Sequence, residues 1–231
     1  MQSFVHLHVH SQYSLLDGQA SIQRLVDKAI GDGMRGMALT DHGVMYGIKE
    51  FINYVTKKNA PLNAEIKKLE KKIEEAQKQN DSEKENKLQS QLADIKNKLF
   101  KPIIGCECYV ARRNRFSQND KIDSSGWHLI VLAKNFTGYK HLIKMVSKSW
   151  TEGFYYRPRI DKELLEQYHE GLIVLSACLG GEIPQKITED QIDEAEEAVR
   201  RYKNLFGDDF YLELQRHKTD RTDADQTTYP K

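Results

Sequence analysis

The sequence from residue 4 to residue 11 reads Phe4-Val5-His6-Leu7-His8-Val9-His10-Ser11, so imidazole and aliphatic side chains alternate. Side chains of an extended strand point to opposite faces in turn, and this stretch predicts a strand with His6, His8 and His10 on one face. Neutral imidazole is a common ligand of zinc, iron and related ions. The alternative is a surface strand that is polar on one side. Three alternating histidines, followed downstream by acids and further histidines, favour a metal site.

The composition limits the class of protein. The chain has 231 residues, of which 30% are charged and 39% hydrophobic, which is enough for one large domain or two small ones. Its 35 basic and 34 acidic residues give a net charge of +1. No global basic field therefore indicates nucleic-acid binding, although a local basic patch remains compatible with it.

The cysteines and the hydropathy of the chain indicate the cellular compartment in which the protein is expected. Cys106, Cys108 and Cys178 are an odd number of cysteines without a dense framework, which is typical of reduced thiols in the cytosol. The N-terminus lacks the basic and then apolar segments of a signal peptide, and no apolar run approaches the length of a membrane span. We expect a cytoplasmic protein without a membrane partner.

Strand and helix signals alternate through most of the chain. Strands are expected at 37–40, 103–110, 127–133, 172–178 and 210–214, and helices at 21–30, 46–57, 137–149 and 191–206. Ser21 is a suitable N-cap for the first of these helices. Such alternation is typical of a βαβ architecture with a parallel sheet, so we expect an α/β fold.

Residues 60–101 differ from the rest of the chain in composition and spacing. Apolar residues recur there at helical spacing, at Ile66, Leu69, Ile73 and Ala76 and again at Leu88, Leu92, Ile95 and Leu99, and nearly all others are Lys, Glu, Gln or Asn. This pattern predicts two amphipathic helices in an antiparallel hairpin, inserted within a single domain over residues 1–231. The charged side chains are interpreted as a solvated face, and a docking surface for a partner is the alternative.

Glu107 lies in the middle of an apolar strand, where a carboxylate is costly unless it is paired or bound to a cation. Cys106 and Cys108 flank it and resemble a metal-binding pair. Because they flank Glu107, both thiols point to the opposite face of the strand, which argues against zinc binding by this pair.

Seven residues with ligand-type side chains lie next to expected strand ends or loops: His8, His10, Asp17, His42, Glu107, His128 and Cys178. Active sites of parallel βα folds collect at the C-terminal ends of strands, and His42 and Cys178 obey that rule whereas His128 does not. Mixed nitrogen, oxygen and sulfur ligands suit a multinuclear zinc, manganese or iron site, and paired metals hydrolyse phosphate esters. No nucleophile elbow or cysteine protease signature is present.

The remaining histidines are expected to have other roles. His6 is expected to support its neighbours through a hydrogen bond, and His141 and His169 to lie on the surface. His217 lies in the polar C-terminal tail, from which it could approach the site.

The loop over residues 153–159 mixes aromatic and basic side chains. Its Tyr155, Tyr156, Arg157 and Arg159 are candidate nucleic-acid contacts, through stacking on bases and pairing with phosphates. Packing of a long loop explains the same composition.

Several of these motifs resemble the PHP (polymerase and histidinol phosphatase) superfamily. They are His8-Val9-His10, Thr40-Asp41-His42-Gly43, Glu107 and His128. Longer segments, among them "FVHLHVHSQYSLLDG" from Phe4, "GFYYRPRID" from Gly153 and "LSACLGGEIP" from Leu175, resemble the PHP domain at the N-terminus of bacterial DNA polymerase III alpha subunits. These segments span nearly the whole chain outside residues 60–101.

The resemblance implies a distorted (β/α)7 barrel and up to three divalent ions, zinc or manganese with iron as a further candidate, held by nine ligands. Seven ligand positions fall on the seven residues named above. The other two form an Asp-x-His pair on a later strand, and no such pair occurs before Lys231. We therefore expect a barrel that is incomplete at its C-terminus, with residues 60–101 as a lineage-specific insertion.

The resemblance also implies two alternative functions within DNA replication. One is a metal-dependent 3′–5′ exonuclease used for proofreading, with His8, His10, Asp17, His42 and Glu107 as catalytic residues. The other is a catalytically silent module that braces the polymerase and docks other replicase subunits, including a separate proofreading subunit. In both, the parent chain is a nucleotidyltransferase and DNA is its partner. A free-standing phosphatase of small esters is a third, weaker hypothesis.

Overall fold

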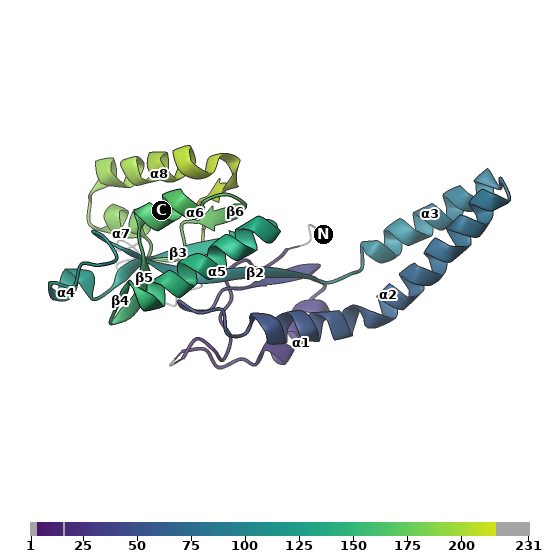
Figure 1. The fold of residues 1–231 in the computed structure, drawn as a ribbon, viewed down its shortest axis with the longest axis horizontal. Coiled ribbons are helices and arrows are strands. Elements are labelled where there is room, and N and C mark those ends of the chain that lie inside the picture. The colour runs from purple at the N-terminus through teal and green to yellow at the C-terminus, as the bar shows by residue number, and fades with distance from the viewer. Residues whose placement is uncertain (1–3, 16, 216–231) are drawn as a thin grey trace, which may run out of the picture.

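The computed structural model describes residues 4–15 and 17–215 and has a mixed α/β fold (Figure 1). Its strands are β1 (Gly36–Leu39), β2 (Lys101–Ala111), β3 (Gly126–Ala133), β4 (Phe154–Tyr155), β5 (Arg157–Ile160), β6 (Leu172–Leu175) and β7 (Phe210–Tyr211). Its helices are α1 (Ile22–Gly31), α2 (Ile48–Lys78), α3 (Ser82–Lys96), α4 (Asp120–Asp123), α5 (Phe136–Thr151), α6 (Lys162–Tyr168), α7 (Glu182–Thr188) and α8 (Ile192–Phe206), followed by the short 3₁₀ helix η1 (Gly207–Asp209). Ser21 caps α1 as expected, since its side chain accepts from the Arg24 amide.

The strands form one seven-stranded sheet in the order β4-β5-β2-β3-β6-β7, with β1 also paired to β2. The long strand β2 pairs in parallel with β1 at its start and with β5 near its end. β3 runs antiparallel to both β2 and β6. The expectation of a parallel sheet is therefore wrong at β3, and also at β4, which runs antiparallel to β5. β2 and β3 are joined by a connection that contains only the four-residue helix α4 rather than a full crossover helix.

The two faces of β2 have different environments. Cys106, Cys108 and Val110 point into the main apolar core, which also contains side chains of β3, α5, α6 and α8. Both thiols are buried and free. Glu107 and Tyr109 point to the other face, so the expected separation of the cysteines from Glu107 is observed.

The segment that carries the first histidines is not a regular strand. The chain bends at Leu7 and His8, although the segment still lies along β1. The amides of Ala38 and Thr40 donate to the carbonyls of His6 and Val9, at 2.8 and 2.9 Å. These donors are two residues apart and their acceptors three, so the segment contains one extra residue, as in a bulge. The predicted strand is therefore wrong here, and simple alternation does not govern the histidines.

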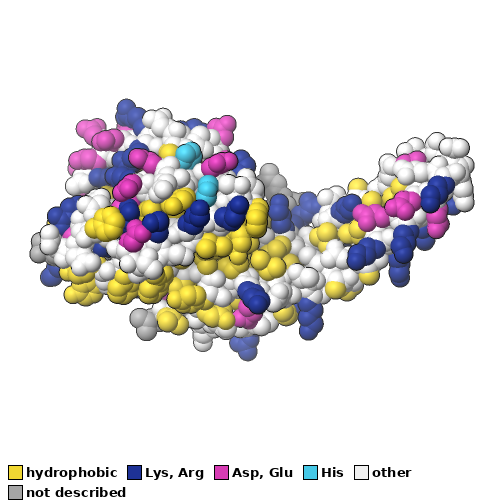
Figure 2. All heavy atoms as spheres, in the orientation of Figure 1, with side chains coloured by type: hydrophobic (Ala, Val, Ile, Leu, Met, Phe, Trp, Pro, Cys, Tyr) yellow, Lys and Arg dark blue, Asp and Glu magenta, His cyan; other side chains and the backbone are white. Residues whose placement is uncertain are grey.

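The predicted helical hairpin is present, but its first helix begins earlier than expected. α2 runs without interruption from Ile48 to Lys78 and includes Pro61, so no break separates residues 46–57 from the hairpin. α3 packs on α2 through a separate apolar cluster around Ile66, Leu69 and Ile95. The hairpin projects from the body (Figure 1), and charged side chains of both signs lie along it (Figure 2).

Within the described part of the chain, none of the helices combines the length and the apolar character that crossing a bilayer requires. His217 and the rest of the C-terminal tail lie outside the described residues.

Candidate metal centre

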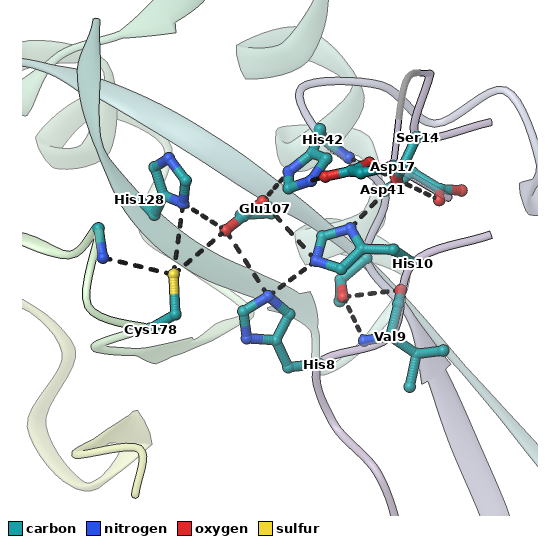
Figure 3. A network of polar contacts seen from close by, with 12 residues as sticks. His8, Val9, His10, Ser14, Asp17, Asp41, His42, Glu107, His128 and Cys178 are labelled. Carbon is teal, nitrogen blue, oxygen red and sulfur yellow. Dashed lines mark hydrogen bonds and ion pairs between the residues drawn. The ribbon is translucent and has the colours of Figure 1, made fainter. Parts of the chain in front are cut away.

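Glu107 is the central residue of a polar network on the face of the sheet opposite the main core (Figure 3). Its side chain is 1% exposed, and its Oε1 atom lies 2.7 Å from His128 Nδ1 and 3.6 Å from His8 Nε2. The Cys178 thiol is 4.0 Å from the same oxygen. One carboxylate oxygen is therefore shared by an imidazole from β3, a thiol from the chain that follows β6 and an imidazole from the N-terminal segment.

The second carboxylate oxygen faces two further histidines. Glu107 Oε2 lies 3.8 Å from His10 Nε2 and contacts His42 Nδ1. Although His42 Nδ1 and Glu107 Oε2 are both buried, neither has a hydrogen bond of acceptable geometry within the described residues. Buried polar atoms are nearly always satisfied. A nitrogen and an oxygen atom that face each other without such a bond are therefore suited to binding a cation.

Two sets of three ligand atoms lie within 4.8 Å of one another and share Glu107. One set consists of His8, His10 and Glu107, and the other of Glu107, His128 and Cys178. Nitrogen, oxygen and sulfur donors in this mixture suit zinc, with iron or manganese as alternatives. Each of the two sets therefore has donors that could hold a metal ion, and Glu107 belongs to both.

Hydrogen bonds orient the imidazoles toward this centre. The Ser14 hydroxyl donates to Asp41 Oδ1 at 2.7 Å, so its oxygen is free to accept the Nδ1 proton of His10 at 3.1 Å. His10 then presents an unprotonated Nε2 to Glu107. In the same way, Asp17 Oδ2 lies 2.8 Å from His42 Nε2 and leaves the Nδ1 atom of His42 to face Glu107.

Asp41 fixes the loop that carries these groups. Its carboxylate is 2% exposed and accepts from the Ser11 amide at 2.6 Å, from the Ser11 hydroxyl and from the Ser14 hydroxyl. Gly43 has a φ of 63°, and a Cβ atom there would lie 2.6 Å from Pro158 Cγ. The chain can therefore turn sharply after His42 only because residue 43 is glycine.

Cys178 is placed by a strained backbone. Ala177, two residues beyond β6, has a φ of 61°, which turns the chain so that the thiol lies 3.5 Å from His128 Nδ1. Burial disfavours the thiolate, but the contact with His128 and the Gly180 amide lower the pKa of Cys178 below its usual value. A lowered pKa favours the thiolate, which is the form that binds metals.

The pKa values of the histidines show where protons lie when no ion is bound. Burial disfavours the charged ring of His8, but contacts with Glu107 and Glu213 raise its pKa to about 9. Burial likewise opposes charge on His128, yet Cys178 and Glu107 raise its pKa to about 10. Burial and the neighbouring His42 lower the pKa of His10 to about 4. The cluster therefore holds protons that a divalent ion displaces on binding.

The structure brings all seven sequence-predicted ligand residues into one network, with Asp17 at its rim. The Asp17 side chain is 62% exposed and reaches the others only through His42. Sequence reasoning missed Ser14, Asp41 and Glu213. Asp41 directly precedes His42 in the Thr-Asp-His-Gly motif and could have been suspected, whereas Glu213 is 205 residues from its partner His8 and gave no signal.

The candidate nucleic-acid residues separate into two groups. Arg159 is fully buried, and its guanidinium donates to the carbonyls of Gly153, Asp123 and Arg115 at 2.8–3.0 Å. The predicted contact of Arg159 with nucleic acid is therefore wrong, because these bonds hold it inside the protein.

The other three members of that group remain accessible. Tyr156 is 72% exposed, and Tyr155 is partly exposed. Arg157 is exposed and lies 5.6 Å from the ring centre of Tyr109, whose edge contacts His128. Arg157 therefore lies beside the metal centre.

His6, His141 and His169 have partners other than Glu107. His6 is exposed and its ring packs edge-on against Phe4, and no hydrogen bond to His8 or His10 is formed. His141 bonds the Glu170 carbonyl and His169 the Glu166 carbonyl.

A mixed α/β sheet with clustered histidines, carboxylates and a thiol on one face defines a domain of the metal-binding α/β class. The family model described as "PHP domain" matches residues 6–217, and the chain belongs to this family. It is 43% identical over 215 residues to the DNA polymerase III subunit alpha of Borreliella burgdorferi, covering 93% of this chain and 15% of that protein. The same subunit of Treponema pallidum is 43% identical over 220 residues, and that of Thermus aquaticus 37% over 218 residues.

The chain spans about 15% of the length of these three relatives. Each match nevertheless covers 93% or more of this chain.

Proposed function

We propose that this chain is the PHP domain of a DNA polymerase III alpha subunit acting in DNA replication, and that it is a metal-dependent phosphoesterase that removes 3′-terminal nucleotides. The observation that carries the proposal is the buried Glu107 carboxylate shared by two sets of three ligand atoms. A degenerate scaffold would be free to lose these side chains, whereas all seven positions retain ligand types.

We further infer that the sheet is part of a distorted (β/α)7 barrel. The N-terminal segment lies along β1, and the chain beyond β7 returns to the same segment, since Glu213 contacts His8 at 2.8 Å. An open flat sheet would keep these two edges apart. Their contact supports a sheet that curls toward closure.

Zinc or manganese, with iron as a further candidate, would be held by His8, His10 and Glu107 on one side and by Glu107, His128 and Cys178 on the other. Such ions supply an activated water and neutralise charge that develops on a phosphate ester. Asp17, at the rim of the network, accepts the Nε2 proton of His42.

Arg157 and Tyr156 supply the contacts expected for a DNA strand. A guanidinium pairs well with phosphate, and an exposed aromatic ring is suited to stacking on a terminal base. Because Arg157 packs over Tyr109 next to His128, it would meet a phosphate that lies at the metal centre.

The test combines metal content with nuclease activity. The double variant His8→Ala/His10→Ala and the matched control His169→Ala, which changes a surface histidine, are compared with the unmodified protein by elemental analysis. Release of 3′-terminal nucleotides is measured on the whole polymerase chain. We expect the double variant alone to lose both metal and nuclease activity, with nucleotide incorporation retained. Unchanged nuclease activity in the double variant overturns the proposal.

A second candidate function is a structural and docking module of the replicase. The hairpin of α2 and α3 favours it, because the hairpin has its own apolar cluster and projects from the body of the fold (Figure 1). Binding of other replicase subunits to a polymerase that lacks the hairpin distinguishes the two. Retained binding excludes the hairpin as the dock.

A further inference from the structure

Glu213 lies two residues beyond β7, and its side chain is 12% exposed. Its Oε1 atom is 2.8 Å from Nδ1 of His8. We propose that Glu213 is a positioning residue of the metal centre, which accepts the Nδ1 proton of His8 and thereby directs the Nε2 lone pair toward the bound ion. This inference rests on the metal binding proposed above and adds to it a carboxylate from the last described segment.

The geometry of the His8 ring supports this assignment. On the far side of the ring from Glu213, Nε2 lies 3.0 Å from His10 Nε2 and 3.6 Å from Glu107 Oε1. Only Nε2 therefore faces the other ligands. Histidines that bind metals commonly donate their second ring proton to a carboxylate, which fixes the tautomer and raises the basicity of the ligating nitrogen. His10 receives the equivalent support from Ser14.

The backbone of Glu213 is tied to the other half of the centre. Its amide donates to the Ser176 hydroxyl at 2.9 Å, and the Ser176 amide donates to the Tyr211 carbonyl at 3.0 Å. Ser176 lies two residues before Cys178 on the chain that leaves β6. A single short segment therefore positions His8 directly and is bonded to the chain that delivers Cys178.

The second oxygen of Glu213 argues for a role other than stability. Glu213 Oε2 is buried and has no hydrogen-bond partner in residues 4–15 and 17–215. A buried oxygen left without a donor destabilises the folded protein. A role in stability alone therefore does not explain the placement of this carboxylate beside His8.

The experiment measures Zn²⁺ affinity of the full chain by competition with a chelator. Glu213→Ala removes the acceptor, and Glu213→Gln keeps the size and an acceptor oxygen without the charge. Asp209→Ala is the matched control, since Asp209 lies just before β7 and pairs with Lys134 at 2.7 Å instead of a histidine. We expect Glu213→Ala to weaken Zn²⁺ binding about 10- to 100-fold. Glu213→Gln should give a smaller loss and Asp209→Ala none.

A second readout separates positioning from general damage. The visible absorption of the Co²⁺-loaded chain reports the ligand field, and we expect it to change in Glu213→Ala but not in Asp209→Ala. Thermal unfolding of the metal-free proteins checks the fold, and Glu213→Gln carries the test if Glu213→Ala does not fold. Unaltered Zn²⁺ affinity and Co²⁺ spectrum in both Glu213 variants overturn the inference and leave the proposed function intact. An unmodified chain that binds no Zn²⁺ overturns both.

Discussion

The Nε2 atoms of His8 and His10 lie 3.0 Å apart, and both face Glu107. Two lone pairs at this separation repel each other unless a positive charge lies between them. When no ion is bound, a proton on His8 supplies this positive charge, because the pKa of His8 is raised to about 9 while that of His10 is lowered to about 4. A divalent ion would take the place of this proton, so ion binding would be linked to the protonation of His8.

Ion binding should raise the thermal stability of the chain. At free Zn²⁺ about 100 times the dissociation constant, linkage gives about 2.7 kcal/mol of stabilisation. For a chain of this size we expect a rise in Tm of about 5 to 10 °C over the chelator-treated protein, measured by calorimetry. The His8→Ala/His10→Ala variant serves as control, and an equal rise in that variant contradicts the prediction.

Arg157 and Arg159 should differ sharply when substituted. Arg159→Met removes the donors of three buried carbonyls, and we expect a loss of about 3 to 5 kcal/mol in the free energy of unfolding. Arg157→Ala changes an exposed side chain and should alter stability by less than about 0.5 kcal/mol. Urea unfolding measures both. Equal losses in the two variants would show that the buried bonds of Arg159 do not stabilise the loop.

Arg157→Ala should instead weaken the binding of a DNA substrate. Because Arg157 lies beside the metal centre, its loss should raise KM for a single-stranded DNA 3′ end and leave Zn²⁺ content unchanged. Lys203→Ala is the control, since Lys203 pairs with Asp208 on α8 and η1. An unchanged KM in Arg157→Ala argues against this guanidinium as a phosphate contact.

Asp41→Asn should weaken metal binding without replacing any ligand. An amide nitrogen cannot accept a hydrogen bond, so at least one of the bonds from Ser11 or Ser14 is lost and the loop that orients His10 is loosened. By analogy with other supporting groups, we expect about 10-fold weaker Zn²⁺ binding. Asp27→Asn, on an exposed carboxylate paired with Lys58, should bind Zn²⁺ normally.

Replacing residues 62–97 with a short Gly-Ser linker should leave the metal centre intact. The apolar cluster of the hairpin is separate from those around the sheet, and Asn59 bonds the Phe100 backbone in both directions at its base. We expect unchanged Zn²⁺ content by elemental analysis. Loss of metal after this deletion would mean that the hairpin supports the centre.

The residue types of the sequence alone indicated which side chains are candidate metal ligands. Alternating histidines, the buried Glu107 and the acids and thiol after strand signals were visible as ligand candidates, and helical spacing predicted the hairpin. The apolar runs likewise placed β2, β3 and α8 to within a few residues. All of these features depend on local periodicity, which side chains express within a few residues of chain.

Only the tertiary structure decided which groups meet and how deep each one lies. Glu213 joins His8 across 205 residues, a contact that no local pattern encodes. Arg157 and Arg159 are two residues apart and share one strand face, yet one is exposed and the other is fully buried. The periodicity of a strand or helix determines the direction in which a side chain points. The burial of that side chain and the residues it contacts depend on elements that are distant in the sequence and pack against it.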